Sequence, residues 1–202
     1  GSDNTVQTSG AVSEANVAGF GNTVTVDDAL GDVTVTGSDN DVHTYGQVDR
    51  RSEINTTTVT GDSNTVTVFG TGNTSRIYQG DSNTMTVSGH DDFAGIDGNH
   101  STVAVNGDDS IADVVGDYST AQSGIDGTST TNVVGVAGNN STALATGSYN
   151  VIVFATGDNS SATALGSGNA VQANGPDSHA TVIGDSASLQ TDPGETVTLI
   201  NP

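Results

Sequence analysis

Residues 61–87 read GDSNTVTVF, GTGNTSRIY, Q and GDSNTMTV, and this stretch decides the fold. Each unit begins with Gly, has Asn at its fourth position and then alternates apolar residues with Thr or a similar polar residue. The nine-residue pattern G-x-x-N-x-V-x-V-x returns as GSDNTV at 1–6, GFGNTVTV at 19–26 and GSDNDV at 37–42. From residue 157 it continues with Ser for Asn and Ala for Val, as in GDNSSATAL. A fixed period over most of a chain is typical of repeat architectures.

The alternation within a unit predicts a short β-strand. Successive strand residues point to opposite faces, so Asn64, Val66 and Val68 share one face and Thr65 and Thr67 share the other. Gly at the first position, often followed by Asp or Ser, supplies the turn, because Gly adopts positive φ at little cost and Asp bonds its own backbone.

A strand of this length cannot bury its apolar face alone, and a nine-residue unit has no room for a crossover helix. The sequence therefore predicts an all-β fold, a β-solenoid of the parallel β-helix type. Each nine-residue unit is a half-coil, so a coil has about 18 residues. Small Val, Ala and Ser suffice for a core two side chains thick, and the chain has no Trp and only 4 Phe. A β-sandwich of independent hairpins is the alternative, but it does not require the same residue types at the same phase in nearly every strand.

The amide at the fourth position predicts a second regular feature, a buried ladder. Asn side chains that stack one coil apart can bond one another, as they do in cross-β stacks. The expected members of this structural ladder are Asn22, Asn40, Asn64, Asn73 and Asn83.

We expect a single domain over residues 1–202, with loop insertions where the frame breaks. These insertions are predicted near 46–53, 89–98 and 124–138. Insertions in solenoids tend to emerge on one side and often carry binding.

The net charge of the chain limits the classes of binding partner that we expect. The chain has 3 Arg and no Lys against 24 acidic residues, 21 of them Asp, which gives a net charge of −21. Nucleic acid is not expected as a partner, because its binding requires a basic surface that displaces counterions from phosphates. No apolar run approaches the roughly 18 residues of a membrane span, so membrane insertion is not expected either. Ser and Asp occur throughout the chain without a nucleophile motif such as G-x-S-x-G, and we expect no enzyme.

No cofactor is expected, with Ca²⁺ as the one candidate. Turn carboxylates would align along an edge of the solenoid, and calcium prefers carboxylate and carbonyl oxygens. A second cluster combines His and Asp in the predicted 89–98 loop and has metal-compatible chemistry. The alternative is a solvated acidic edge that keeps the protein soluble or adapts it to high salt. The candidate metal ligands are Asp62, Asp81, Asp108, Asp109, His90, Asp91 and Asp92.

Two stretches resemble known families of repeats. Residues 64–87 resemble the curlin repeat of secreted amyloid fibre subunits, whose pattern includes Q-x-G-x-x-N-x-A-x-V. Residues 141–187 are similar to the S-x-A-x-A-x-G coils of trimeric autotransporter adhesin heads. Both families are extracellular and neither is enzymatic in these repeats, so the resemblance implies a secreted or cell-surface protein. The residues that carry the resemblance are Gly80, Asn83, Met85 and Val87, together with Gln79, which directly precedes Gly80 where the pattern has one residue between Gln and Gly.

The predicted function is a non-enzymatic extracellular structural protein that assembles into a filament or surface fibre, with a biofilm or adhesion role. An open solenoid leaves unpaired backbone at each end, which invites end-to-end strand addition between copies. The C-terminal PGETVTLINP is the most apolar tail, and Val197, Leu199 and Ile200 are its candidate assembly residues.

The alternative function is an ice-binding solenoid, or one that binds another surface ligand. Thr-x-Thr rows such as Thr65 and Thr67 could form a flat array of hydroxyl and methyl groups. The rows are interrupted by Asp41 with His43 and by Thr74 with Arg76. Ordinary outward strand residues also favour Thr, because Thr has a high β propensity.

Overall fold

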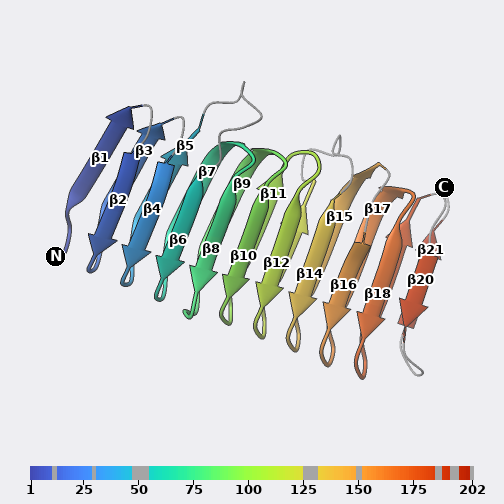
Figure 1. Ribbon diagram of the computed structural model, residues 1–202. Coiled ribbons are helices and arrows are strands. Elements are labelled where there is room, and N and C mark those ends of the chain that lie inside the picture. Colours follow the sequence, from blue (N-terminus) through green and yellow to red (C-terminus); the bar gives the residue numbers. More distant parts are fainter. Residues whose placement is uncertain are drawn as a thin grey trace.

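The computed structural model describes residues 1–10, 13–28, 31–46, 55–124, 132–148, 152–184, 188–191 and 196–200. These residues form a β-solenoid, as the repeat predicts, with coils stacked side by side from the N-terminal to the C-terminal end (Figure 1). The described part of the chain contains strands and turns only. Accordingly, no helix long and apolar enough to cross a membrane is found in it.

Two parallel sheets make up the solenoid, and consecutive strands alternate between them. We call them the odd sheet, with 11 strands, and the even sheet, with 10 strands. The odd sheet consists of β1 (Thr5–Gly10), β3 (Thr23–Asp28), β5 (Asp41–Tyr45), β7 (Thr65–Thr71), β9 (Thr84–His90), β11 (Thr102–Asn106), β13 (Thr120–Ser123), β15 (Thr142–Ser148), β17 (Ser161–Ser167), β19 (His179–Ile183) and β21 (Thr196–Ile200). The even sheet consists of β2 (Ser13–Ala18), β4 (Gly31–Thr36), β6 (Thr56–Thr60), β8 (Thr74–Tyr78), β10 (Phe93–Asp97), β12 (Ile111–Val115), β14 (Val133–Ala137), β16 (Ile152–Thr156), β18 (Ala170–Asn174) and β20 (Ser188–Thr191).

Each strand pairs in register with its equivalent one coil away. Val6 lies opposite Val24, and Val24 lies opposite Val42. Hydrogen-bonded equivalents are 18 residues apart in most coils and 19 in some. The separation grows to 24 and 22 in the two coils that contain residues 47–54 and 125–131. The predicted coil of about 18 residues is confirmed.

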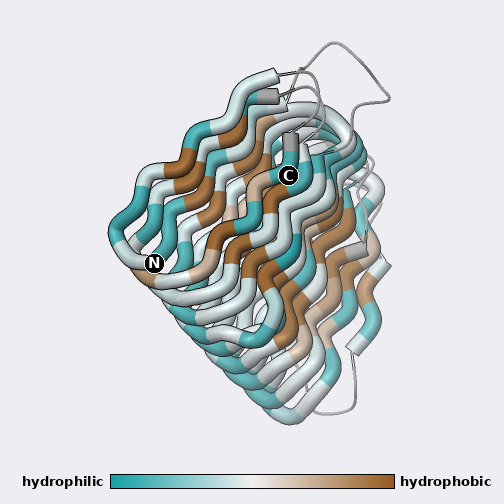
Figure 2. Tube along the Cα trace, turned by 60° about the vertical axis from the view of Figure 1, so that its left-hand side comes forward, coloured by the Kyte–Doolittle hydropathy of each residue, from teal (hydrophilic) through white to brown (hydrophobic). Residues whose placement is uncertain are grey.

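The core lies between the two sheets and consists of one row of small side chains from each. Val66 and Val68 are completely buried, and so are Ala162 and Ala164 in the C-terminal half. Apolar positions of successive coils form aligned rows along the solenoid (Figure 2). The predicted inward and outward faces of the strands are therefore confirmed, because the alternation in sequence matches the pleat of the sheet.

Four-residue turns join most even strands to the next odd strand, and we call this side of the solenoid the tight-turn edge. The turn 61–64 is typical: Gly61 has φ 125° and Ser63 has φ 57°. A Cβ on Gly61 would overlap the carbonyl oxygen of Gly37 in the preceding coil. Gly begins these turns because only a residue without a side chain lets the coils stack this closely.

The predicted insertion at 89–98 is wrong. His90 ends β9 and residues 93–97 form β10, so the frame continues through this segment. Ala94 and Ile96 point into the core at the positions that Val occupies elsewhere. The frame was hidden because Asp92 replaces Asn at the fourth position and Gly95 replaces Thr or another side chain on the outer face.

Of the other two predicted insertions, the first falls largely and the second partly outside the described residues. Of 46–53, the structure describes only Gly46. Of 124–138, residues 125–131 lie outside the described part, whereas Val133–Ala137 form β14, which corrects the predicted C-terminal boundary. Each odd strand is joined to the following even strand on the side of the solenoid opposite the tight-turn edge. We call that side the connecting edge.

Candidate functional site

The predicted Asn ladder is confirmed, and it runs beside the tight-turn edge. The Nδ2 of Asn22 donates to Oδ1 of Asn40 at 2.9 Å, and Nδ2 of Asn40 donates to Oδ1 of Asn64 at 3.0 Å. The backbone N–H of Asn64 donates to Oδ1 of Asn83 at 2.8 Å. From there Ser continues the ladder: the N–H of Asn83 donates to Oγ of Ser101. The amides thus satisfy backbone groups that the core would otherwise leave unpaired.

A second ladder runs beside the connecting edge, and Asn73 belongs to it. Nδ2 of Asn55 donates to Oδ1 of Asn73 at 3.1 Å. Both the N–H and Nδ2 of Asn73 then donate to Oδ1 of Asp92 at 2.9 Å. The Asn ladder of the sequence is therefore two ladders, one for each edge, because alternate units belong to opposite turns of the coil.

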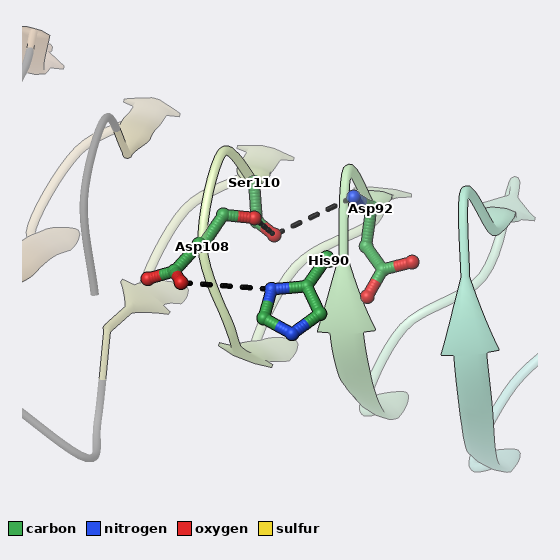
Figure 3. Close-up of polar contacts among 4 residues, drawn as sticks. All are labelled: His90, Asp92, Asp108 and Ser110. Carbon is green, nitrogen blue, oxygen red and sulfur yellow. Dashed lines mark hydrogen bonds and ion pairs between the residues drawn. The ribbon is translucent and has the colours of Figure 1, made fainter. Parts of the chain in front are cut away.

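Asp92 is the unusual member of this second ladder. Its side chain is 2 % exposed, and its own N–H donates to Oγ of Ser110 at 3.4 Å (Figure 3). Its Oδ2 has no hydrogen-bond partner. Burial raises the pKa of Asp92 from 3.8 to about 6, while the hydrogen bonds from Asn73 and the nearby His90 oppose the rise. The sequence placed Asp92 in a surface loop; the nine-residue spacing from Asn83 to Asp92 to Ser101 was the signal that could have located it.

Other candidate metal ligands lie near Asp92 but do not form a common site with it. Figure 3 shows His90 next to Asp108, with Nδ1 and Oδ2 3.6 Å apart, and both side chains are exposed by more than a third. Asp91 is exposed and has φ 58°, and Asp109 is exposed in the following coil. The His and Asp cluster predicted from the sequence is thus divided between a surface pair and a buried carboxyl.

The remaining candidate ligands, Asp62 and Asp81, lie on the tight-turn edge. Oδ1 of Asp62 accepts from the N–H of Asp81, and Oδ1 of Asp81 accepts from the N–H of Asn99, both at 2.8 Å. Along this edge the Oδ1 atoms of Asn99, Asp117 and Asn139 then accept in turn from the N–H groups of Asp117, Asn139 and Asp158. Most carboxylates are therefore separated by an amide, which reduces their mutual repulsion.

Across the residues that the structure describes, no group of three or more His, Asp or Glu side chains is arranged to hold a metal ion. The seven candidate ligands are distributed over both edges of the solenoid. A calcium site stays a prediction.

The candidate assembly residues lie on the last strand of the odd sheet. In β21 the side chains of Val197, Leu199 and Ile200 are 47 %, 52 % and 48 % exposed. Ala180 and Val182 hold the positions of Val197 and Leu199 one coil earlier and are completely buried. By register, Val197 and Leu199 therefore occupy core positions. Within the described chain no further coil covers them.

The outer face of the odd sheet carries the threonine rows. The first outward-facing residues of the odd strands lie in register and form a column along the sheet. Thr occupies eight of the eleven positions in this first column, which starts with Thr5 and Thr23. Thr74 and Arg76, which seemed from the sequence to interrupt this face, lie on β8 in the even sheet. The interruption at β5 remains, and the second column is mixed, with Leu144 among its members. Ice binding stays a prediction.

The outer face of the even sheet was missed by sequence reasoning. Its first column changes from Thr56 and Thr74 to apolar Phe93, Ile111 and Val133. A groove opens beside this column, with Gly95 on its floor. The pattern could have been found by aligning the fifth position of alternate units once 89–98 and 124–138 were assigned to strands.

Comparisons with known proteins bear only on the N-terminal part. Residues 1–52, which include β1 to β5, match a family described as a protein of unknown function (DUF3060). The match covers less than half of the chain, and its description names no activity. No curated protein and no solved structure matches the chain. The resemblances to curlin repeats and to autotransporter heads therefore stay predictions.

Proposed function

We propose that this protein is a non-enzymatic structural protein that acts outside the cell and assembles end to end into a filament or surface fibre. The observation that carries the proposal is the exposed edge of β21, where core-facing Val197 and Leu199 have no strand over them in the described chain. An unpaired strand edge with an apolar face is a template for adding another strand.

The first coil offers the complementary surface. Val6 of β1 is only partly buried, although Val24, its equivalent one coil on, is completely buried. Each Oδ1 in the ladder accepts from the coil before it, as Asn22 accepts from Asn4. The Oδ1 of Asn4 therefore faces the position that the last coil of another copy would take.

Repetition makes these two ends fit one another. A shift by one coil superimposes each strand on the next, so in the odd sheet β1 of one copy can occupy the place that follows β21 of another. The even sheet has 10 strands to the 11 of the odd sheet, so one strand position between β20 and β2 stays open at this junction. Such a head-to-tail contact uses two different surfaces and does not close, and contacts of this kind generate open filaments. Adhesion or biofilm formation would follow from a fibre of this type at the cell surface.

The test compares two charge-matched double variants of the last strand. V197D/L199D places carboxylates on the core-facing side of β21, whereas T196D/T198D places them on its outer side. We expect the wild-type chain and T196D/T198D to form filaments in negative-stain electron microscopy, and V197D/L199D to remain monomeric in light scattering after size exclusion.

A wild-type chain that stays monomeric at high concentration would overturn the proposal. Equal assembly of the two double variants would also overturn it, because the core-facing positions of β21 would then have no special role.

A further inference from the structure

The groove on the outer face of the even sheet has a volume of about 320 Å³ and is lined by residues of β8, β10 and β12. These three strands lie far from either end of the solenoid (Figure 1). The floor of the groove is Gly95 in the middle of β10, where the absent side chain makes room for the ring of Phe93. Arg76 on β8 and Asp113 on β12 are the in-register neighbours of Gly95 and form the two sides. The groove is thus built from three adjacent strands, not from loops.

The guanidinium of Arg76 is fixed beside the groove. Its Cζ lies 4.5 Å from the centre of the Phe93 ring, a cation–π contact. Burial raises the pKa of Asp113, and the positive charge of Arg76 opposes this rise. Arg76 is the only Lys or Arg in the described part of a chain whose net charge is −21.

The rest of the lining combines apolar and acidic groups. Tyr78 and Val115 line the groove and are 41 % and 48 % exposed. Asp97 lines it from the end of β10. A ligand therefore meets an aromatic side chain, an aliphatic side chain, five N–H donors on one guanidinium and two carboxylates as acceptors.

This set of groups points to a neutral, hydroxylated ligand. An anion would be opposed by the net charge of the chain and by Asp97 and Asp113. A cation would find the face of Phe93 already taken by Arg76. A sugar ring has C–H faces that pack on aromatic and aliphatic side chains, and vicinal hydroxyls that both donate and accept hydrogen bonds. We propose that this groove binds a sugar residue of a neutral oligosaccharide or polysaccharide, a function beyond filament formation.

The most informative variant is G95V, because a valine side chain fills the floor of the groove. Gly95 is not among the residues with positive φ, and a Cβ there would be 3.1 Å from the nearest atom, in the ring of Phe93. A ring on the outer face can shift by a few tenths of an ångström, and Val is favoured in strands, so the fold should be retained. A104V is the matched control, because Ala104 points outward from the middle of β11 on the other sheet.

The experiment is native gel electrophoresis of wild type, G95V and A104V in gels that contain mixed-linkage β-glucan, xylan, glucomannan or polygalacturonate. We expect at least one of the three neutral polysaccharides to retard the wild type and A104V equally. G95V should lose at least tenfold in affinity, with an unfolding temperature no lower than that of the wild type. Retardation by none of the neutral polysaccharides, retardation by polygalacturonate alone, or equal retardation of G95V would overturn the proposal. Binding does not require assembly, so V197D/L199D should be retarded as well, which separates this proposal from that of the filament.

Discussion

At the scale of single residues, Asp92 is the position where the repeat departs most from its own rule. It replaces an amide with a titratable carboxyl at a ladder position that is 2 % exposed. Asn73 donates two hydrogen bonds to Oδ1, and Oδ2 has no hydrogen-bond partner. Ionisation of a carboxyl in such surroundings is disfavoured because desolvation penalises the charged form.

This arrangement predicts a specific pH dependence of stability. The pKa of Asp92 is about 6 in the folded protein and 3.8 without the fold, so the folded state holds the proton more tightly. The stabilisation is complete below about pH 3.8 and is lost as the pH rises through about 6. D92N removes this loss, and we expect it to stabilise the protein at pH 7.5 by on the order of 2 kcal/mol.

Urea unfolding of the wild type and D92N between pH 4 and 8 measures this effect. The two stabilities should converge at low pH and separate between pH 4 and 6. D91N is the matched control, because Asp91 is the exposed neighbour of Asp92 in the same turn. A D92N protein that is less stable than the wild type at pH 7.5 would contradict the prediction.

At the scale of elements, the ladder beside the tight-turn edge links each odd strand to the next. Asn64 accepts at Oδ1 from both the N–H and Nδ2 of Asn40, and its own Nδ2 donates to the carbonyl of Gly37. Ser takes the same position in later coils, where Oγ of Ser119 accepts from the N–H of Ser101 and donates to the carbonyl of Gly98.

Ser should therefore replace Asn64 in part, whereas Ala should not. N64A leaves the buried N–H of Asn40 without an acceptor and leaves its Nδ2 with only the carbonyl of Gly19. We expect a loss of about 2 to 3 kcal/mol in the free energy of unfolding. N64S keeps an acceptor and should lose at least about 1 kcal/mol less. The urea midpoints of the two variants test this, and equal losses would show that the amide acts only by filling space.

At the scale of the whole molecule, charge governs association. Copies that meet end to end bring two chains of net charge −21 together, and the carboxylates of both edges repel. The Debye length falls from about 30 Å at 0.01 M salt to about 8 Å at 0.15 M, so salt screens this repulsion.

We expect the critical concentration for filament formation, measured by light scattering, to fall at least several-fold over that range of NaCl. Assembly that weakens with added NaCl would contradict this prediction. CaCl₂ and MgCl₂ at equal ionic strength form the second comparison: a stronger effect of Ca²⁺ would indicate the calcium site predicted on the acidic edges, whereas screening alone affects both alike.

The regular part of this molecule could be read from local sequence. Alternation of Val66 and Val68 with Thr65 and Thr67 determined the strands and their inward faces, because the pleat has the same period of two. The Gly that begins each unit determined the tight turns, because no other residue fits against the preceding coil. Repetition of both signals at nine residues then determined the solenoid.

The candidate sites required the tertiary structure. Whether Asp92 lies in a loop or in the core depends on which coil Asn73 and Ser110 occupy, and neither is adjacent in sequence. The groove arises only where Arg76, Gly95 and Asp113 come into register on three strands of one sheet. The sequence by itself determined the repeat and hence the solenoid, since the alternation and the nine-residue period are local patterns that every unit carries. The tertiary structure alone decided which side chains meet across coils, since stacking brings together residues 18 or more positions apart.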